Sequence, residues 1–193
     1  MNGLQFFLTR YVRARAMIHD MLADLSEAQI RAAPREGVNT LAWLAWHIAR
    51  VEDVGVNRLV LDDQQLFERG GWARRLNVPR CDFGTGMTAA EVRDLSVSID
   101  LEQLLAYSDA VVERTLDVVQ RMHPEDLDAI NDAAYMQRVV VQDGFVSEDA
   151  SWVPEYMEGQ PKGFFLCHLA LTHKFVHQGE ANAIRGLMGH PGR

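Results

Sequence analysis

The sequence predicts an all-α protein, a four-helix bundle with crossover connections and short extra helices in its long loops. Four long segments of the 193-residue chain carry apolar residues at three- and four-residue steps, which is the period of an amphipathic helix. The apolar residues are mostly Leu, Ala, Val and Met, and long β-branched runs are few. The connections at 62–87 and 123–161 are too long for tight helical hairpins, so we expect crossovers within a single domain, 1–193.

The first two long helices are expected over 3–22 and 40–61. Either Asn39 or Thr40 can cap the second of them. Between the two, Ser26-x-x-Gln29 has the form of a capping box, which predicts a short helix that ends at Pro34. The apolar stripe of the first helix includes Leu4, Phe7, Tyr11, Ile18 and Leu22, and that of the second includes Leu41, Leu44, Ile48 and Val51.

The last two long helices are expected over 100–122 and 162–188. Thr88-x-x-Glu91 is a second capping box and predicts a short helix over 89–95. Glycine and proline punctuate the two long connections. Connections of this length are uncommon in compact domains and often line a site.

Charge and composition exclude several classes of function. The net charge is −8 and no Lys/Arg cluster stands out, which argues against nucleic acid and against anionic membranes as partners. No apolar run approaches the ~20 residues of a membrane span, and the N-terminus lacks the pattern of a signal peptide. Cys81 and Cys167 are far apart and predict no disulfide scaffold, and Cys167 is expected to be buried. We therefore expect a cytoplasmic protein.

Three histidines form the informative pattern. His173 and His177 are four residues apart on the last helix, which places both imidazoles on one face, separated by ~40°. They can bind one metal ion together, or they can be two partly buried histidines bonded to backbone carbonyls. His47 lies in the middle of the second long helix on an apolar face, where a buried imidazole needs a partner. Because bundles build metal sites from side chains that project inward from facing helices, the three together predict a divalent metal site.

Such a site would leave at least one coordination position open, as catalytic sites do. That position can take water, whose pKa falls, or a thiol, which is held as thiolate. Imidazole suits several metals, and we expect zinc or nickel first and iron as an alternative.

Other residues near the histidines have weaker claims. Glu180 lies one turn past His177 and can accept the far N–H of a ligand, or it can reach solvent. Trp43, one turn from His47, and Arg50 are candidate substrate-binding residues, although a surface salt bridge is the ordinary role of such an arginine. On an ideal helix His168 points ~140° away from His173, so we do not expect it in the site. By the same reasoning of helical phase, Glu52 and Asp53 should point away from the metal.

The two histidine segments resemble those of the DinB-like (DinB/YfiT) superfamily. Asn39-Thr-Leu-Ala-Trp-Leu-Ala-Trp-His47-Ile-Ala-Arg-Val-Glu-Asp53 is similar to the motif of the family's second helix. His168-Leu-Ala-Leu-Thr-His173-Lys-Phe-Val-His177-Gln-Gly-Glu-Ala-Asn-Ala-Ile-Arg-Gly-Leu-Met-Gly189 is similar to its last helix. The order and lengths of the helices agree over nearly the whole chain, whereas the loops at 62–87 and 123–161 carry no motif that we can place. The resemblance implies a four-helix fold with His47, His173 and His177 as metal ligands.

The resemblance also indicates a kind of reaction. Characterised members include metal-dependent transferases that use low-molecular-weight thiols such as mycothiol or bacillithiol, and a maleylpyruvate isomerase. We therefore expect a thiol-dependent S-transferase or isomerase that acts on a small electrophile. A metal-dependent hydrolase and a non-catalytic metal- or small-molecule-binding stress-response protein are the alternatives. The expected partners are a small-molecule substrate and, if an apolar helix face is left over, a second copy of the chain.

Overall fold

Helices make up the regular structure of the chain. The computed structural model describes residues 1–193, the side chain of Glu148 excepted. Within this described part, pairing outside helices is limited to an isolated bridge between Ile130 and Pro161. The predicted all-α class is confirmed.

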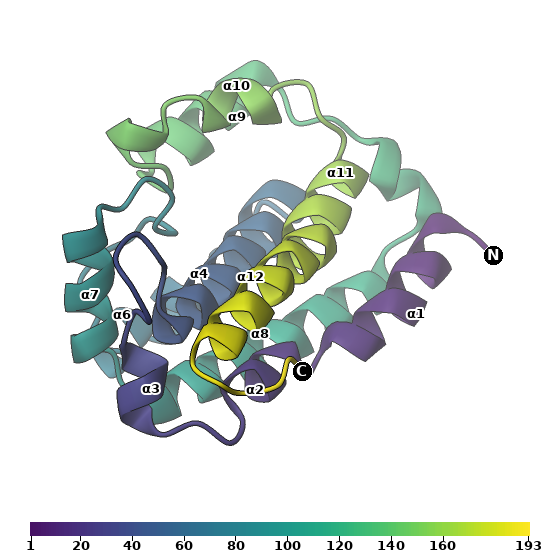
Figure 1. The fold of residues 1–193 in the computed structure, drawn as a ribbon. Helices are drawn as coiled ribbons and strands as arrows, with labels where there is room; N and C mark the ends of the chain where they lie inside the picture. Colours follow the sequence, from purple (N-terminus) through teal and green to yellow (C-terminus); the bar gives the residue numbers. More distant parts are fainter.

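Four long arms pack against one another as a bundle (Figure 1). Their positions agree closely with the four helices predicted from the sequence. The arms are α1 (Gly3–Ala14) with α2 (Met17–Leu22); α4 (Leu41–Asp53) with the π-helix η1 (Val54–Val60); α8 (Leu101–Arg121); and α11 (Lys162–Cys167) with the π-helix η5 (His168–Thr172) and α12 (His173–Leu187).

The predicted caps begin their helices as expected. Thr40, and not Asn39, caps α4, because its hydroxyl accepts a hydrogen bond from the backbone N–H of Trp43 at 3.0 Å. The capping box at Ser26 begins α3 (Glu27–Arg31), and the one at Thr88 begins α7 (Ala89–Ser98), which runs beyond the predicted end.

The two long connections contain short helices, as predicted. The first holds α5 (Leu66–Arg69) and α6 (Trp72–Arg75). The second holds η2 (Pro124–Asp128), α9 (Ala133–Met136), η3 (Gln137–Gln142), η4 (Glu148–Ala150) and α10 (Val153–Met157). Figure 1 shows α9 and α10, in green, lying across one end of the bundle.

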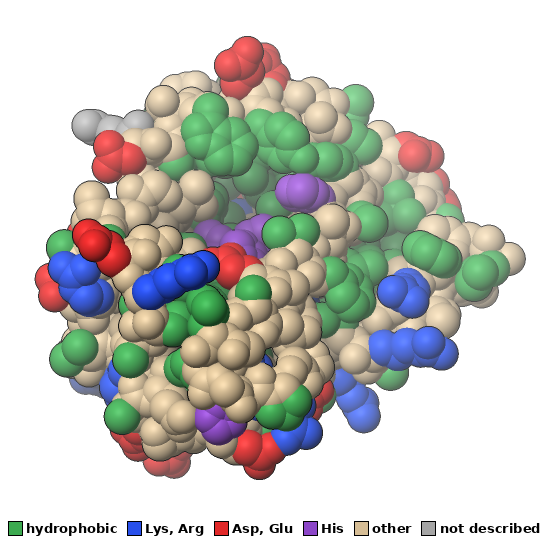
Figure 2. Space-filling view, viewed as in Figure 1, with side chains coloured by type: hydrophobic (Ala, Val, Ile, Leu, Met, Phe, Trp, Pro, Cys, Tyr) green, Lys and Arg blue, Asp and Glu red, His purple; other side chains and the backbone are tan. Residues whose placement is uncertain are grey.

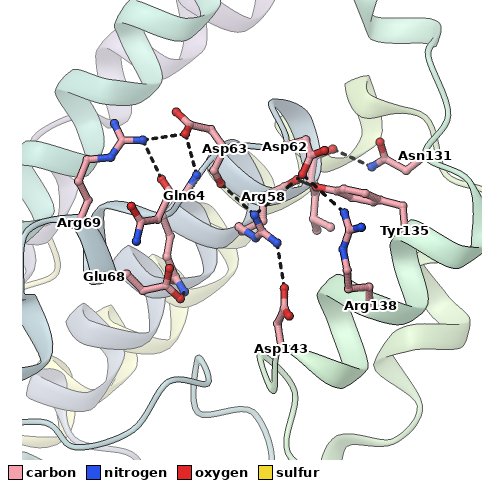
Figure 3. Close-up of polar contacts among 12 residues, drawn as sticks. Arg58, Asp62, Asp63, Gln64, Glu68, Arg69, Asn131, Tyr135, Arg138 and Asp143 are labelled. Carbon is pink, nitrogen blue, oxygen red and sulfur yellow. Dashed lines mark hydrogen bonds and ion pairs between the residues drawn. The ribbon is translucent and has the colours of Figure 1, made fainter.

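Arg58, at the end of η1, joins the two connections (Figure 3). Its guanidinium lies 2.8 Å from Asp143 of the second connection and 3.3 Å from the carbonyl oxygen of Asp63 in the first. The Tyr135 hydroxyl donates to the carbonyl of Arg58, and Arg138 lies 3.9 Å from Asp62. These contacts hold both connections against the end of the second arm.

The π-helices η1 and η5 meet where the second and fourth arms cross. A Cβ atom on Gly55 of η1 would lie 2.8 Å from Cβ of Leu169 in η5. Only glycine therefore permits this approach of the two backbones. The close crossing brings the midpoints of the two arms together.

A buried polar cluster receives one side chain from each arm. The Lys174 ammonium lies 2.6 Å from the Glu52 carboxylate, and both side chains are almost fully buried. Thr115 donates to Glu52 at 2.7 Å, and the Tyr11 hydroxyl also donates to it. Glu52 thus points into the core and away from the three histidines, as predicted.

Two remaining predictions concern membranes and cysteines. No helix in the described residues is both long and apolar enough to cross a bilayer. Cys81 and Cys167 are free thiols, as expected from their spacing. The prediction that Cys167 is buried was wrong, because both cysteines are exposed.

Candidate metal centre

His47 is fixed by a loop that approaches α4 from outside the bundle. Its Nδ1 lies 2.5 Å from the carbonyl oxygen of Phe83, and its ring stacks on Trp43 with 4.6 Å between ring centroids. A carbonyl oxygen can only accept a hydrogen bond, so Nδ1 carries the proton. The lone pair of Nε2 is therefore available on the side that faces the other histidines.

His177 is oriented in the same way by Glu180. Its Nδ1 lies 2.8 Å from the Glu180 carboxylate, which also accepts from the Asn39 amide at 2.8 Å. The hydrogen bond from His177, and to a lesser extent the one from Asn39, lowers the pKa of Glu180. The carboxylate is therefore ionised at neutral pH and can only accept hydrogen bonds. Nδ1 of His177 thus carries the proton and Nε2 is a free donor to a metal, which is the role predicted for Glu180.

The three rings converge on one point. Nε2 of His173 lies 3.1 Å from Nε2 of His177, and one nitrogen from each of the three rings lies within 4.8 Å of the others. Two nitrogens bound to one zinc ion at ~2.0–2.1 Å in tetrahedral geometry would be about 3.3 Å apart. The spacing of His173 and His177 fits such an ion, His47 lies within reach of it, and the described residues contribute no fourth His, Cys, Asp or Glu to the cluster.

Burial keeps His47 and His173 neutral. Burial lowers the pKa of His47 to about 4 and the pKa of His173 well below its ordinary value. The neighbouring His47 and His177 lower the pKa of His173 further. Neutral imidazole is the form that binds metal. One atom lacks a partner: Nδ1 of His173 is buried without a hydrogen bond.

The comparisons with known proteins agree with this fold. The family model described as the DinB superfamily matches residues 10–181, a range that includes the three histidines. The chain belongs to the DinB superfamily. No curated protein matches it significantly. A crystal structure of a conserved protein from Enterococcus faecalis superposes with a TM-score of 0.70 over 98% of this chain and 99% of that one, at 18% identity. At this identity the likeness shows the shared fold alone.

In this DinB-superfamily chain, Arg50 is not a surface residue. Its side chain is fully buried, so the prediction of a surface salt bridge was wrong, whereas contact with substrate stays a prediction. Its guanidinium donates to Gln65 at 2.6 Å and to the carbonyl of Cys81 at 2.5 Å, and it lies 3.5 Å from Asp53. Arg50 thus anchors the start of the loop whose Phe83 carbonyl orients His47. Helical phase indicated on which face of α4 Arg50 lies, but it could not indicate that a loop covers that face.

The same loop makes a tight turn after Phe83. Gly84 has φ of +85°, and a Cβ atom there would lie 2.5 Å from the ring of Trp46. The second connection supports the turn, because Ser147 donates to the carbonyl of Thr85 at 2.9 Å. The two long connections, which both lie within the range matched by the family model, therefore position the second-helix histidine.

A pocket of about 80 Å³ opens beside His173. Figure 2 shows this face, with histidine side chains at the floor of a hollow and hydrophobic side chains above it. Its walls include Val51, Phe83, Thr85, Trp152, Tyr156 and His168. Larger hollows, of about 420 and 450 Å³, lie beside Leu95 and Arg93 and contain none of the histidines.

His168 was missed by sequence reasoning. We predicted that it points away from His173 because an ideal α-helix was assumed. The backbone N–H of His173 instead bonds to the carbonyl of His168, five residues back, which is the π-helical pattern. The wide turn brings both rings to the same pocket. Trp43 does pack beside the site as expected, and its indole N–H donates to Met87 at 3.2 Å, but it does not line this pocket.

Proposed function

We propose that this protein is a metal-dependent enzyme that uses a thiol to attack a small electrophile. His47, His173 and His177 would hold one divalent ion, zinc or nickel first and iron as an alternative. The observation that carries the proposal is that Phe83 and Glu180 each fix a tautomer whose free Nε2 faces the other rings. An ordinary core histidine also needs a partner for Nδ1, but it has no need to turn its free Nε2 towards two other imidazoles.

The surroundings of the histidines support catalysis over a purely structural ion. Three neutral ligands leave a coordination position free, and a pocket adjoins His173. A bound ion would supply Lewis acidity, which lowers the pKa of a thiol or a water placed beside it. The chain's own part is to position the ligands through Phe83 and Glu180 and to limit water through the aromatic residues Trp152 and Tyr156.

Hydrolysis is less well supported than thiol transfer. A hydrolase needs a general base near the reacting water. Glu180 was the candidate, but its carboxylate already accepts hydrogen bonds from His177 and Asn39. It therefore acts on the ligand rather than on a substrate.

Metal content is the first test. We expect about one zinc, nickel or iron ion per chain in wild-type protein prepared with metal in excess and then desalted, and near zero in His47→Ala and His177→Ala. His123→Ala is the matched control, since this histidine is exposed and outside the cluster. Equal metal in the wild type and both cluster variants would exclude the site.

Thiol transfer is the second test. Chloroacetamide is incubated with mycothiol or bacillithiol and catalytic amounts of protein. A C–S bond forms, the C–Cl bond breaks, chloride leaves and the thiol proton passes to solvent. We expect turnover that needs thiol and metal and is lost in His177→Ala. Ester cleavage without thiol would instead indicate a hydrolase, and metal binding with neither activity would indicate a non-catalytic protein.

A further inference from the structure

The pocket beside His173 carries an inference that rests on the proposed function and specifies its substrate. Its wall on the bundle side is apolar. It includes Val51 from α4 and Leu169 from the π-helix η5. On the outer side, Trp152 and Tyr156 come from the second long connection. These two aromatic residues are 58% and 44% exposed, which is unusual for large rings and leaves them as the rim of the opening.

The charge of the pocket is the second observation. None of its lining residues is Asp, Glu, Lys or Arg. The buried cations Arg50 and Lys174 are engaged elsewhere, by Gln65 and by Glu52. In the metal-free chain, an anionic group that entered would lose its hydration without gaining a side-chain countercharge in the wall, which is costly.

Size is the third observation. The space of about 80 Å³ is roughly half of the ~150 Å³ cavity that holds benzene. It therefore fits a group of a few heavy atoms rather than a whole cofactor.

His168 gives the pocket a polar group of fixed orientation. Its ring is parallel to that of Phe164, with an interplanar angle of 8° and 5.1 Å between centroids, and it also contacts Tyr156 at 5.5 Å. No hydrogen bond from the described residues engages its ring nitrogens. The π-helical turn places it on the same side as His173. A substrate group in the pocket would thus lie between a metal ligand and an imidazole held by stacking.

We propose that this pocket takes the small, uncharged, largely apolar end of the electrophile, and that His168 is the specificity-determining residue that hydrogen-bonds its polar atom. The size fits the end of a short aliphatic amide, aldehyde or ketone. The larger, polar thiol would approach the metal from outside the pocket.

Binding to the metal-free chain tests the proposal without relying on catalysis. Butyramide and butyrate are nearly isosteric and differ in charge. In ¹⁵N-labelled protein without metal, we expect butyramide to shift the backbone amide signals of Val51, Thr85 and Leu169 with a saturable, millimolar Kd. We expect butyrate to bind at least 10-fold more weakly, and the much bulkier adamantane carboxamide to leave these signals unchanged.

Variants assign the hydrogen bond. His168→Phe keeps a ring to stack on Phe164 but removes the nitrogens, and we expect it to weaken butyramide at least five-fold. His123→Phe, in an exposed loop, is the matched control and should bind as the wild type does. The proposal would be overturned if butyrate bound as tightly as butyramide, or if the signal shifts were confined to other surfaces. It would also be overturned if His168→Phe and His123→Phe bound butyramide with the same Kd.

The two proposals can fail separately. Loss of metal binding would remove the proposed function and leave the amide titration unaffected. Metal-dependent turnover of chloroacetamide, together with equal affinity of butyrate and butyramide for the metal-free chain, would uphold the enzyme and overturn the neutral pocket.

Discussion

At the scale of single residues, the candidate centre depends on what the far nitrogen of each imidazole contacts. His47 has a carbonyl and His177 a carboxylate, whereas His173 has no partner at that position. The carboxylate is the stronger acceptor and is itself held by Asn39. Glu180 should therefore contribute more to metal affinity than its distance from the ion suggests.

Glu180→Leu should weaken metal binding by about 10–100-fold, because His177 loses the acceptor that fixes its tautomer. Glu180→Gln should lose less, since an amide oxygen can still accept. Competition with a chromogenic zinc chelator at pH 7 measures both. Affinities within two-fold of the wild type for both variants would show that the carboxylate does not act on the ligand.

Burial of His47 predicts acid sensitivity in the metal-free protein. Its pKa is about 4 in the folded chain against an ordinary value of 6.5, so the unfolded chain takes up the proton first. The free energy of unfolding should be level above pH 6.5 and fall as the pH drops from 6.5 towards 4, by about 3 kcal/mol from this group.

Urea unfolding at pH 7.0, 5.5 and 4.5 measures this loss. His47→Gln removes the titrating group and should show a smaller fall over the same range, whereas His123→Ala should follow the wild type. A parallel pH dependence in wild type and His47→Gln would contradict the assignment.

Residue identity and spacing were enough to predict the three histidines and Glu180. They could not predict Arg50. The sequence shows an arginine on a helix face near the site, but its burial depends on the carbonyl of Cys81, which arrives from a loop whose path has no periodic signal.

At the scale of elements, the π-helices account for the error about His168. Hydrophobic period locates a helix because ~100° per residue is assumed throughout. A single wide turn leaves the apolar pattern on either side recognisable and rotates one half against the other. The bounds of the fourth arm were therefore predicted well, while the phase of its first half was not.

The crossing of the two π-helices gives a prediction of its own. Gly55→Ala should destabilise the protein by about 1–3 kcal/mol, because the new methyl group meets Cβ of Leu169 and not a flexible side-chain end. Gly179→Ala in α12 is the control. A Cβ atom there meets nothing within 4 Å, and the change should stabilise by about 0.5–1 kcal/mol. Chemical denaturation measures both, and effects of the same sign would contradict the close crossing.

At the scale of the whole molecule, the Tyr11, Glu52, Thr115 and Lys174 cluster ties the four arms together. Lys174→Met should cost about 3–5 kcal/mol, because it leaves the Glu52 carboxylate buried without its cation. The double variant with Glu52→Gln should recover much of that loss.

Lys162→Met is the matched control, since Lys162 is only half-buried and lies in no ion pair among the described residues. A double-mutant cycle from urea unfolding gives the coupling of the buried pair. Additive effects would show that the two side chains act independently of each other.

The bundle and the bounds of its arms could be predicted from apolar period and capping residues. The arrangement of the two long connections could not, because contacts such as Arg58 with Asp143 join residues far apart in sequence and have no local signature. A homodimer stays a prediction, which sedimentation of the purified chain tests directly.

The wide turn at His168–Thr172 also has a consequence for comparing relatives. It amounts to one residue inserted into the last helix just ahead of the HxxxH pair. In a superfamily member without that extra residue the helix is regular here, so that an imidazole four positions ahead of the first histidine of the pair lies on the same face and one five positions ahead points ~140° away. The number of residues between an upstream histidine and the pair can be counted in any alignment. Together with the presence of the extra residue, it would sort the superfamily into chains that keep an imidazole at the wall of this pocket and chains that turn it to solvent.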